Sequence, residues 1–240
     1  MLAIRLALAA DGRADELGEL TATLARLPAT DPLRAGLDLQ VFRRSKLDNY
    51  VDHSRVALEL EAGPEGVRVD YPRAVLKQAD QELRGQTVDP EKKTPTWTAL
   101  GALTLNEVAE VLDCSVSLAR DLPLAKLVET RAASYQGRPA RLLLLNLTPR
   151  LSKEARKHVK NAESTMSIWV GEDGLPLAAE RTDRTRGTFL LLGFENVRKQ
   201  SWAFGRRGNR LFALRHQVED SASGLGQSFQ NRVLAVLSVR

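Results

Sequence analysis

The side chains that could do chemistry in this 240-residue chain are few and lie far apart in the sequence. One short segment has metal-ligand character, because it places two carboxylates and an imidazole together at Asp48, Asp52 and His53. The segment lies in a polar connection, whereas a metal site needs ligands held in a fixed geometry. We therefore favour a solvated turn over a metal site. The single cysteine, Cys114, lies in an apolar helical run and is predicted to be a buried, unreactive thiol.

Motifs typical of catalysis are missing from the sequence. It contains no Gly-x-Ser-x-Gly elbow, no His-Glu-x-x-His zinc motif, no P-loop and no dinucleotide-binding glycine fingerprint. The three histidines are widely separated, at His53, His158 and His216. Because catalysis needs convergent polar groups, the sequence predicts a protein that is not an enzyme and that uses no cofactor or metal.

The net charge of +5 is compatible with an acidic partner. Basic residues gather at helical spacing in one segment, at Arg150, Lys153, Arg156, Lys157 and Lys160. A nucleic-acid partner would require aromatic side chains among them, but aromatics make up 5% of the chain and none lies near this segment. A nucleic-acid partner is therefore not expected. A solvated helix face is favoured, and anionic phospholipid headgroups at a membrane surface are the alternative.

No stretch approaches the roughly 20 apolar residues of a membrane-spanning helix. Residues 1–13 combine one early basic residue with a short apolar, alanine-rich run. They are interpreted as the remnant of a secretory signal, which implies a periplasmic location, with a disordered segment or the first turns of a helix as alternatives.

Two amphipathic helices are predicted from residue spacing. The first has leucines at three- and four-residue steps, at Leu17, Leu20, Leu24 and Leu27. The second begins at Thr104, whose capping box is completed by Glu107, and it ends at Pro123. Its apolar face is formed by Leu105, Val108, Val111, Leu112, Leu118 and Leu122. Between the two, residues 85–98 are polar and contain two prolines, which predicts a long loop that is either mobile or a lid.

Alternation of apolar and polar residues predicts an antiparallel sheet. It is clearest at Val56, Leu58 and Leu60, which a hairpin turn over residues 63–66 joins to the next strand. Residues 163–239 read as a meander of further strands, with turns at 171–174, 184–187 and 205–209. The composition does not change sharply along the chain, so a single domain over residues 1–240 is predicted.

Two strands of the meander are apolar on both faces, at residues 189–194 and 211–214. One face can be covered by the predicted helices, and the other must meet a second layer or a ligand. A strongly curved sheet closing around its helices would enclose an apolar cavity, and ordinary core packing is the alternative. The side chains predicted to line the apolar side are Ile168, Leu177, Phe189, Leu191, Leu211 and Ala213 from the strands, with Leu112 and Leu118 from the helix.

The segment Ser-Ile-Trp-Val-Gly-Glu-Asp-Gly-Leu-Pro-Leu at residues 167–177 resembles the LolA-like superfamily of bacterial outer-membrane lipoprotein-sorting proteins. The likeness continues through Arg181–Arg184, Gly187–Phe189 and Phe194–Val197, and it covers about residues 135–197. No residue matches the arginine latch of that superfamily. The resemblance implies a half-barrel of antiparallel strands with helices filling its concave side. It also implies binding of acyl chains or hydrophobic partners in the periplasm without chemistry.

Taken together, these features predict an α+β fold, a strongly curved antiparallel sheet or half-barrel with helices packed on its concave face. The predicted function is that of a non-enzymatic periplasmic protein that binds a lipid or another hydrophobic ligand, as a lipid or lipoprotein carrier or sensor. The alternative is a structural or interaction module of the cell envelope, with a filled core and a protein partner.

Overall fold

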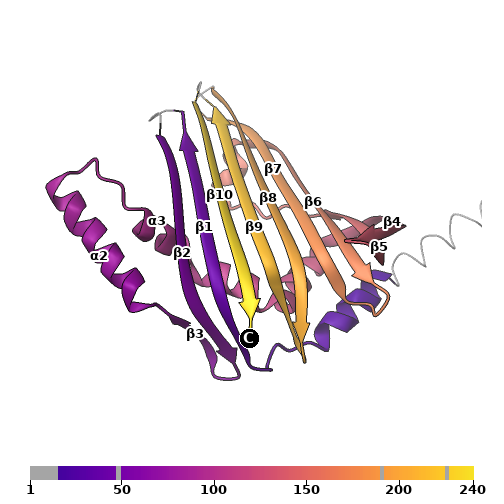
Figure 1. The fold of residues 1–240 in the computed structure, drawn as a ribbon. Helices are drawn as coiled ribbons and strands as arrows, with labels where there is room; N and C mark the ends of the chain where they lie inside the picture. The colour runs from indigo at the N-terminus through magenta and orange to yellow at the C-terminus, as the bar shows by residue number, and fades with distance from the viewer. Residues whose placement is uncertain (1–15, 47–49, 190–191, 225–226) are drawn as a thin grey trace, which may run out of the picture.

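Ten strands form one antiparallel sheet in the computed structural model, which describes residues 16–46, 50–189, 192–224 and 227–240 (Figure 1). Their order across the sheet is β3-β2-β1-β10-β9-β8-β7-β6-β5-β4, so the sheet is open, with β3 and β4 at its edges. The strands are β1 Leu33–Ser45, β2 Tyr50–Gly63, β3 Gly66–Asp70, β4 Ala125–Tyr135, β5 Arg138–Leu147, β6 Val159–Gly171, β7 Pro176–Phe189, β8 Leu192–Arg207, β9 Arg210–Gly224 and β10 Gln227–Val239. The prediction of an α+β protein with a large antiparallel sheet is confirmed.

The first and last strands of the chain meet in the middle of this sheet. β1 to β3 run outward to one edge, the helices follow, and β4 begins again at the opposite edge. The meander from β4 to β10 then returns, and β10 pairs antiparallel with β1, with Leu39 opposite Ala235. The sheet is therefore continuous only because two segments nearly 200 residues apart in sequence form hydrogen bonds with each other.

Period-two alternation gives the sheet two different faces. In β1 the side chains of Leu37 and Leu39 are buried while Asp38 and Gln40 are more exposed, and Leu58 is buried beside them in β2. Successive strand residues point to opposite faces, so the buried set lies on one face. We call this the helix face, because α3, α4 and α5 pack against it, and we call the other the open face (Figure 1).

The helices lie mainly between β3 and β4 in the sequence. They are α2 Arg73–Val88, α3 Pro95–Gly101, α4 Leu105–Leu112, α5 Cys114–Asp121 and α6 Ala155–His158, with a 3-10 turn at Leu122–Leu124 and an N-terminal helix over residues 16–25. The N-terminal helix confirms the first amphipathic prediction, since Leu20 and Leu24 are buried. The basic helix predicted near residues 152–160 is shorter than expected, because the chain enters β6 at Val159.

The predicted loop over residues 85–98 is largely helical. α2 continues to Val88 and α3 begins at Pro95, where a proline is tolerated because the first helical N–H needs no partner. The buried Glu82 of α2 caps α3, since its carboxylate accepts hydrogen bonds from the Thr96 N–H at 2.8 Å and from the Thr96 hydroxyl at 2.7 Å. This contact between helices is not visible in the local sequence pattern.

The second predicted helix is two helices in the structure. Its start is confirmed, because the Thr104 hydroxyl accepts a hydrogen bond from the Glu107 N–H at 3.2 Å. The chain then breaks at Asp113, whose ψ of 56° is not helical, and α5 starts directly after it. Leu105, predicted on the apolar face, is 89% exposed at the first position of α4. A helix of eight residues buries only one narrow stripe, and Leu105 lies outside it.

The segment predicted as one strand over residues 187–197 is a hairpin. β7 ends at Phe189 and β8 begins at Leu192, and these two residues are paired across the strands. The predicted turn at residues 184–187 is wrong, because this segment lies within β7. Arg184 and Arg186 of β7 both form ion pairs with Glu195 of β8, at 3.4 and 3.0 Å. The expected connection over residues 43–52 is also shorter, since β1 reaches Ser45 and β2 starts at Tyr50.

Arg210 is the largest side chain that is fully buried in the described part of the chain. From the start of β9 it forms an ion pair with Asp113, between α4 and α5. Its Nε donates to the carbonyl of Asp31 at 2.8 Å, and one terminal nitrogen lies 3.4 Å from the carbonyl of Leu112. One guanidinium therefore joins the segment before β1, the α4–α5 junction and β9.

Replacing this side chain tests its structural role. Arg210→Met should lower the free energy of unfolding by about 3–5 kcal/mol, because it leaves Asp113 and two carbonyls without their partner. Arg207→Met is the matched control, since Arg207 is directly opposite on β8 and exposed, and a loss of about 0.5 kcal/mol or less is expected there. Urea denaturation at pH 7 measures both variants. Equal losses would show that Arg210 does not hold the layers together.

Candidate functional site

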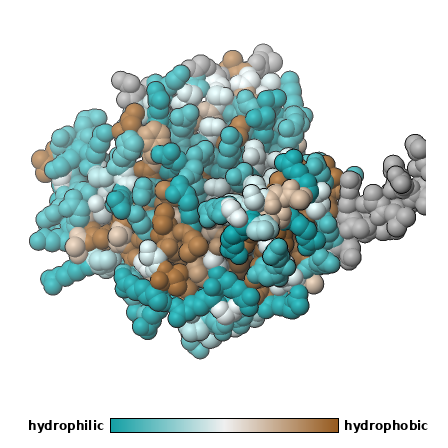
Figure 2. All heavy atoms as spheres, turned by 45° about the vertical axis from the view of Figure 1, so that its right-hand side comes forward, coloured by the Kyte–Doolittle hydropathy of each residue, from teal (hydrophilic) through white to brown (hydrophobic). Residues whose placement is uncertain are grey.

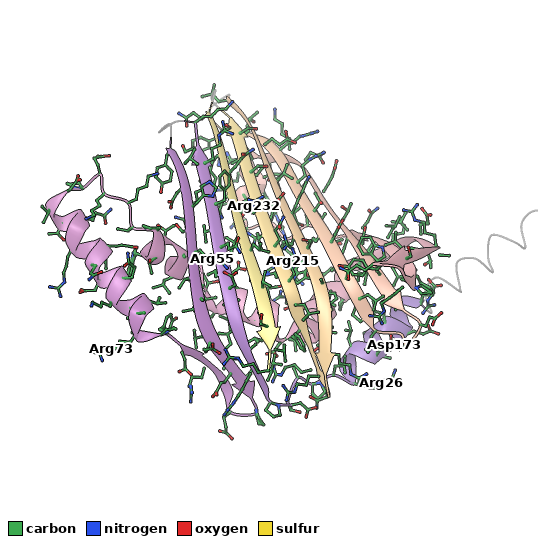
Figure 3. The ribbon with its side chains drawn as sticks, viewed as in Figure 1. Arg26, Arg55, Arg73, Asp173, Arg215 and Arg232 are labelled. Atoms are coloured by element: carbon green, nitrogen blue, oxygen red, sulfur yellow. The ribbon has the colours of Figure 1, made fainter. Side chains whose placement is uncertain are left out.

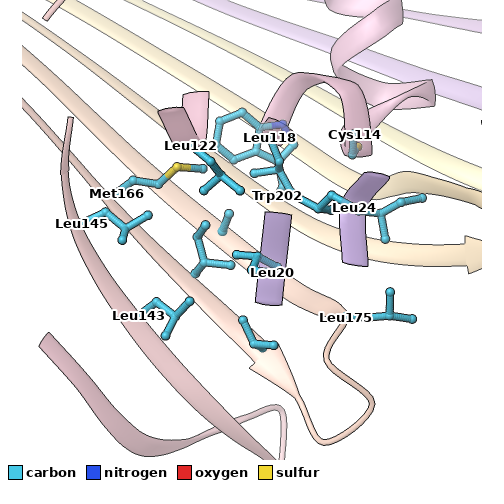
Figure 4. Close-up of a cluster of buried hydrophobic side chains, with 14 of the residues drawn as sticks. Leu20, Leu24, Cys114, Leu118, Leu122, Leu143, Leu145, Met166, Leu175 and Trp202 are labelled. Atoms are coloured by element: carbon cyan, nitrogen blue, oxygen red, sulfur yellow. The ribbon is translucent and has the colours of Figure 1, made fainter. Parts of the chain in front are cut away.

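The candidate site is the interface between the helix layer and the helix face of the sheet. Two buried apolar clusters fill it. The first lies between the N-terminal helix, α5 and strands β5 to β9, with Leu20 and Leu118 facing Trp202 and Met166 (Figure 4). The second lies between α3, α4 and strands β1, β2 and β10. Both form because amphipathic helices and alternating strands can bury their apolar sides only against each other.

The structure gathers most of the residues predicted to line this interior. Four of them belong to the first cluster, namely Ile168, Leu211, Ala213 and Leu118. Leu112 belongs to the second cluster, and Leu177 is buried in β7.

Phe189 does not line the interior. Its side chain is 54% exposed, and its ring lies against that of His158 at 5.0 Å between centroids. It stands at the end of a hairpin, where the helix layer does not reach, so the apolar run that motivated its selection has a different cause. Leu191 lies outside the described residues.

The interior is closely filled where α5 meets the sheet. The crevice there is lined by Leu118 and Cys114 of α5, by Met166 of β6 and by Trp202 and Phe204 of β8, and its volume is about 10 Å³. That is room for about one water molecule. An acyl chain would therefore enter this interface only if α5 moved away from the strands.

His216 is an exception within this apolar surrounding. Its imidazole is 2% exposed and stacks on the Trp202 indole, with centroids 5.0 Å apart and planes 11° from parallel. Its Nδ1 lies 3.9 Å from a carboxylate oxygen of Glu107, and its buried Nε2 has no hydrogen-bond partner. Buried polar atoms in proteins are nearly always paired, so an unpaired one calls for an explanation.

Charged groups border His216 on the helix face. Arg198 of β8 lies 3.3 Å from Asp220 of β9 and 3.9 Å from Glu107 of α4. Burial, and then the Arg198 charge, lower the pKa of His216 to about 4. Burial raises the pKa of Glu107, against the opposing effect of Arg198. The imidazole is therefore neutral at pH 7, and its unpaired nitrogen can take part in one neutral hydrogen bond.

A second ion-pair group ties α5 to β7. Arg181 contacts Asp121 at the end of α5 at 2.7 Å and Asp183 within its own strand at 2.8 Å. The hydroxyl of Ser164 donates to the same Asp183 at 2.5 Å. These charges satisfy one another, so they position the helix and leave no free acid or base.

The nucleophile expected of an enzyme is not provided by Cys114. Its Sγ donates to the carbonyl of Glu110 at 3.2 Å, and burial raises the pKa of the thiol well above its ordinary value. The residue is thus a buried thiol, as predicted. Asp52 and His53, considered above as metal ligands, are neighbours on β2 and point to opposite faces, while Asp48 lies outside the described residues. Within the described ranges, no three His, Cys, Asp or Glu side chains cluster in a way that could hold a metal ion.

Neither protein-family models nor curated proteins give a match to this chain. Among the helices in the described part of the chain, none combines the length and the apolar character needed to span a membrane.

Residue spacing alone did not identify His216, Arg198 or Arg181 as parts of one interface. A signal was present, because charged and polar residues recur at every second position where β7, β8 and β9 extend beyond the apolar cluster, at Arg181 and Asp183, at Arg198 and Gln200, and at His216 and Asp220. Which face they occupy depends on cross-strand register, and the sequence pattern does not contain it.

The buried imidazole predicts a specific pH dependence. The unfolded chain protonates His216 near pH 6.5 and the folded chain near pH 4, so its contribution to stability is complete above pH 6.5 and is lost as the pH falls. His216→Phe removes this loss and keeps a ring against Trp202. The stability of the variant relative to the parent should therefore rise by about 2 kcal/mol between pH 7 and pH 5.

The comparison with the parent protein isolates His216, because the raised pKa values of Glu107 and Glu110 act in both proteins. His158→Phe, at a half-exposed site, is the control and should show no such pH-dependent difference. Urea denaturation at both pH values gives the four free energies. A constant difference between parent and His216→Phe would mean that His216 is not buried in its neutral form.

Proposed function

We propose that this chain is a non-enzymatic periplasmic protein that binds a lipid or another hydrophobic ligand between its sheet and its helix layer. In this proposal the sheet acts as a curved half-barrel with the helices on its concave side, as in the LolA-like superfamily that residues 167–177 resemble. The open ten-stranded sheet and the packing of α3, α4 and α5 on one face support it.

The observation that carries the proposal is the unpaired Nε2 of His216 beside the apolar cluster. An amphiphile with a carbonyl or hydroxyl group would satisfy this nitrogen and lay its apolar chain along Trp202. Ligand sites of this kind are mostly apolar and contain a few well-placed polar groups that fix orientation. A neutral imidazole suits a neutral polar group, such as an ester, better than a free charge.

Entry of the ligand requires α5 to leave the sheet. α4 and α5 are eight residues each, and α5 has no side-chain hydrogen bond at its N-terminus. Helices of this length are not stable by themselves and depend on the packing of their apolar stripe. An acyl chain that takes the place of Leu118 against Trp202 would replace that packing, so displacement of the helix has a compensating gain.

Tryptophan fluorescence can test this location directly. The chain has three tryptophans, and a protein with Trp97→Phe and Trp169→Phe keeps only Trp202. A stearic acid brominated along its chain should quench Trp202 emission in a saturable manner, because bromine quenches only at short range. Added His216→Phe should weaken binding by about tenfold, the effect of one lost buried hydrogen bond.

The matched control keeps Trp169 as the only tryptophan. Trp169 is adjacent to Ile168 in β6 and therefore points to the open face, where its ring packs against Tyr135 at 5.9 Å. A chain bound under α5 should leave its emission unchanged. Equal quenching of both tryptophans would indicate non-specific adsorption, and no quenching of Trp202 would contradict the proposed site.

A second candidate function is an interaction module of the cell envelope. The filled crevice of about 10 Å³ favours it, as do three large apolar side chains left in solvent on the helix layer. These are Trp97, Leu105 and Val116, which are 52%, 89% and 60% exposed. This function predicts no uptake of the brominated fatty acid and unchanged fluorescence of both tryptophans.

A further inference from the structure

The open face of the sheet carries a hollow that the proposed function does not use. Its volume is about 380 Å³, within the lower range of small-molecule sites. Four neighbouring strands contribute to it, β2, β1, β10 and β9, and three arginines surround it, Arg55, Arg215 and Arg232 (Figure 3). Hydrophilic side chains dominate the surface seen in Figure 2, with apolar ones gathered in patches among them.

Strand register fixes the relative positions of these arginines. Arg232 of β10 is opposite Phe42 of β1, and Arg215 of β9 is opposite Val236 of β10. Four residues separate positions 232 and 236, so the two arginine positions are about 13 Å apart along the strands. Leu234 lies between them on the same face. The two guanidinium groups therefore stand at opposite ends of an apolar floor.

The arginines differ in how far their charge is already satisfied. Arg55 makes two hydrogen bonds to the carboxylate of Asp38, at 2.8 and 2.7 Å. Arg215 donates only to the neutral Gln217, at 2.9 Å, and Arg232 lies over the Phe42 ring at 5.6 Å from its centroid. Throughout the described ranges, neither Arg215 nor Arg232 has an ion pair within 4.0 Å.

One further carboxylate is near the hollow. Glu219 is opposite Arg232 in the register and accepts a hydrogen bond from Gln217 at 2.8 Å. Three arginines thus face two carboxylates, Asp38 and Glu219, which leaves a surplus of one positive charge. His53, which also lines the hollow, packs its ring against Phe42 at 4.8 Å.

We propose that this hollow binds an organic oxyanion, a carboxylate or a phosphate ester, carried on an apolar or aromatic body. Guanidinium groups bind such oxyanions through paired hydrogen bonds, and Arg232 is held in place by its contact with Phe42. Phe42 and Leu234 provide the surface for the apolar part of the ligand. The site is on the opposite face from His216 and is independent of the ligand proposed for the helix face.

Calorimetric titration at low ionic strength tests this site, with phenyl phosphate as the probe. Binding to one site is expected, with affinity lowered about tenfold or more by Arg232→Gln and by Arg215→Gln, because each removes a charged hydrogen bond. Both side chains are exposed, so the variants should fold normally. Arg34→Gln is the control, since it removes the same charge from an exposed arginine that is already paired with Glu61 at 2.9 Å.

Two further titrations identify the source of the oxyanion. Inorganic phosphate should bind more weakly than phenyl phosphate if the apolar floor contributes. Vesicles that contain phosphatidylglycerol show whether a lipid headgroup can occupy the site, and binding to them that depends on Arg232 but occurs without phenyl phosphate binding would assign the site to headgroups. No binding of any probe, or equal weakening by Arg34→Gln, would overturn the proposal.

Discussion

The buried guanidinium of Arg210 is the contact on which the arrangement of the two layers depends. It holds Asp31, which precedes the first strand, Asp113 at the break between α4 and α5, and its own strand β9. A charge at 2% exposure is tolerated only when it is paired and hydrogen-bonded, so these partners must be placed together. The break at Asp113 follows from the same contact, because the aspartate caps one helix end while it pairs with the arginine. With the helix junction fixed, α4 and α5 can cover only one face of the sheet.

The two faces of the sheet consequently offer different chemistry. The helix face buries leucines and alanines with one unpaired imidazole, and it suits a neutral, mainly apolar ligand. The open face keeps its arginines in contact with water and suits a small anion. Because strand residues alternate, adjacent residues of a strand such as Val233 and Arg232 serve different faces, and each proposal can be tested without disturbing the other.

The charged groups on the helix face explain why the interior is not an active site in the usual sense. Arg181, Asp121 and Asp183 neutralise one another, and Arg198 is shared between Asp220 and Glu107. Pairing of this kind fixes α4 and α5 over the strands and leaves His216 as the one buried side chain there with an unsatisfied nitrogen. A single neutral imidazole without a nucleophile can orient a ligand, whereas acid–base or covalent catalysis needs a second convergent group.

Features that depend on neighbours in sequence were determined by the sequence alone. The alternation of Leu37 and Leu39 with polar residues, the hairpin after Ala62 and the cap at Thr104 are all present as predicted, because strand pleat, turn and helix start are local. Features that depend on distant pairing were decided by tertiary structure. The apolar run at Phe189 looks like a buried strand, yet it ends a hairpin.

The pairing of β1 with β10, the contact of Glu82 with α3 and the stacking of His216 on Trp202 join residues that are far apart along the chain. Local periodicity carries no information on which strands become neighbours, and a shift of one residue in register would exchange the two faces. The class of fold and the apolar helix stripes therefore follow from the sequence. The position of the imidazole, and the three arginines around one hollow, exist only in the folded sheet.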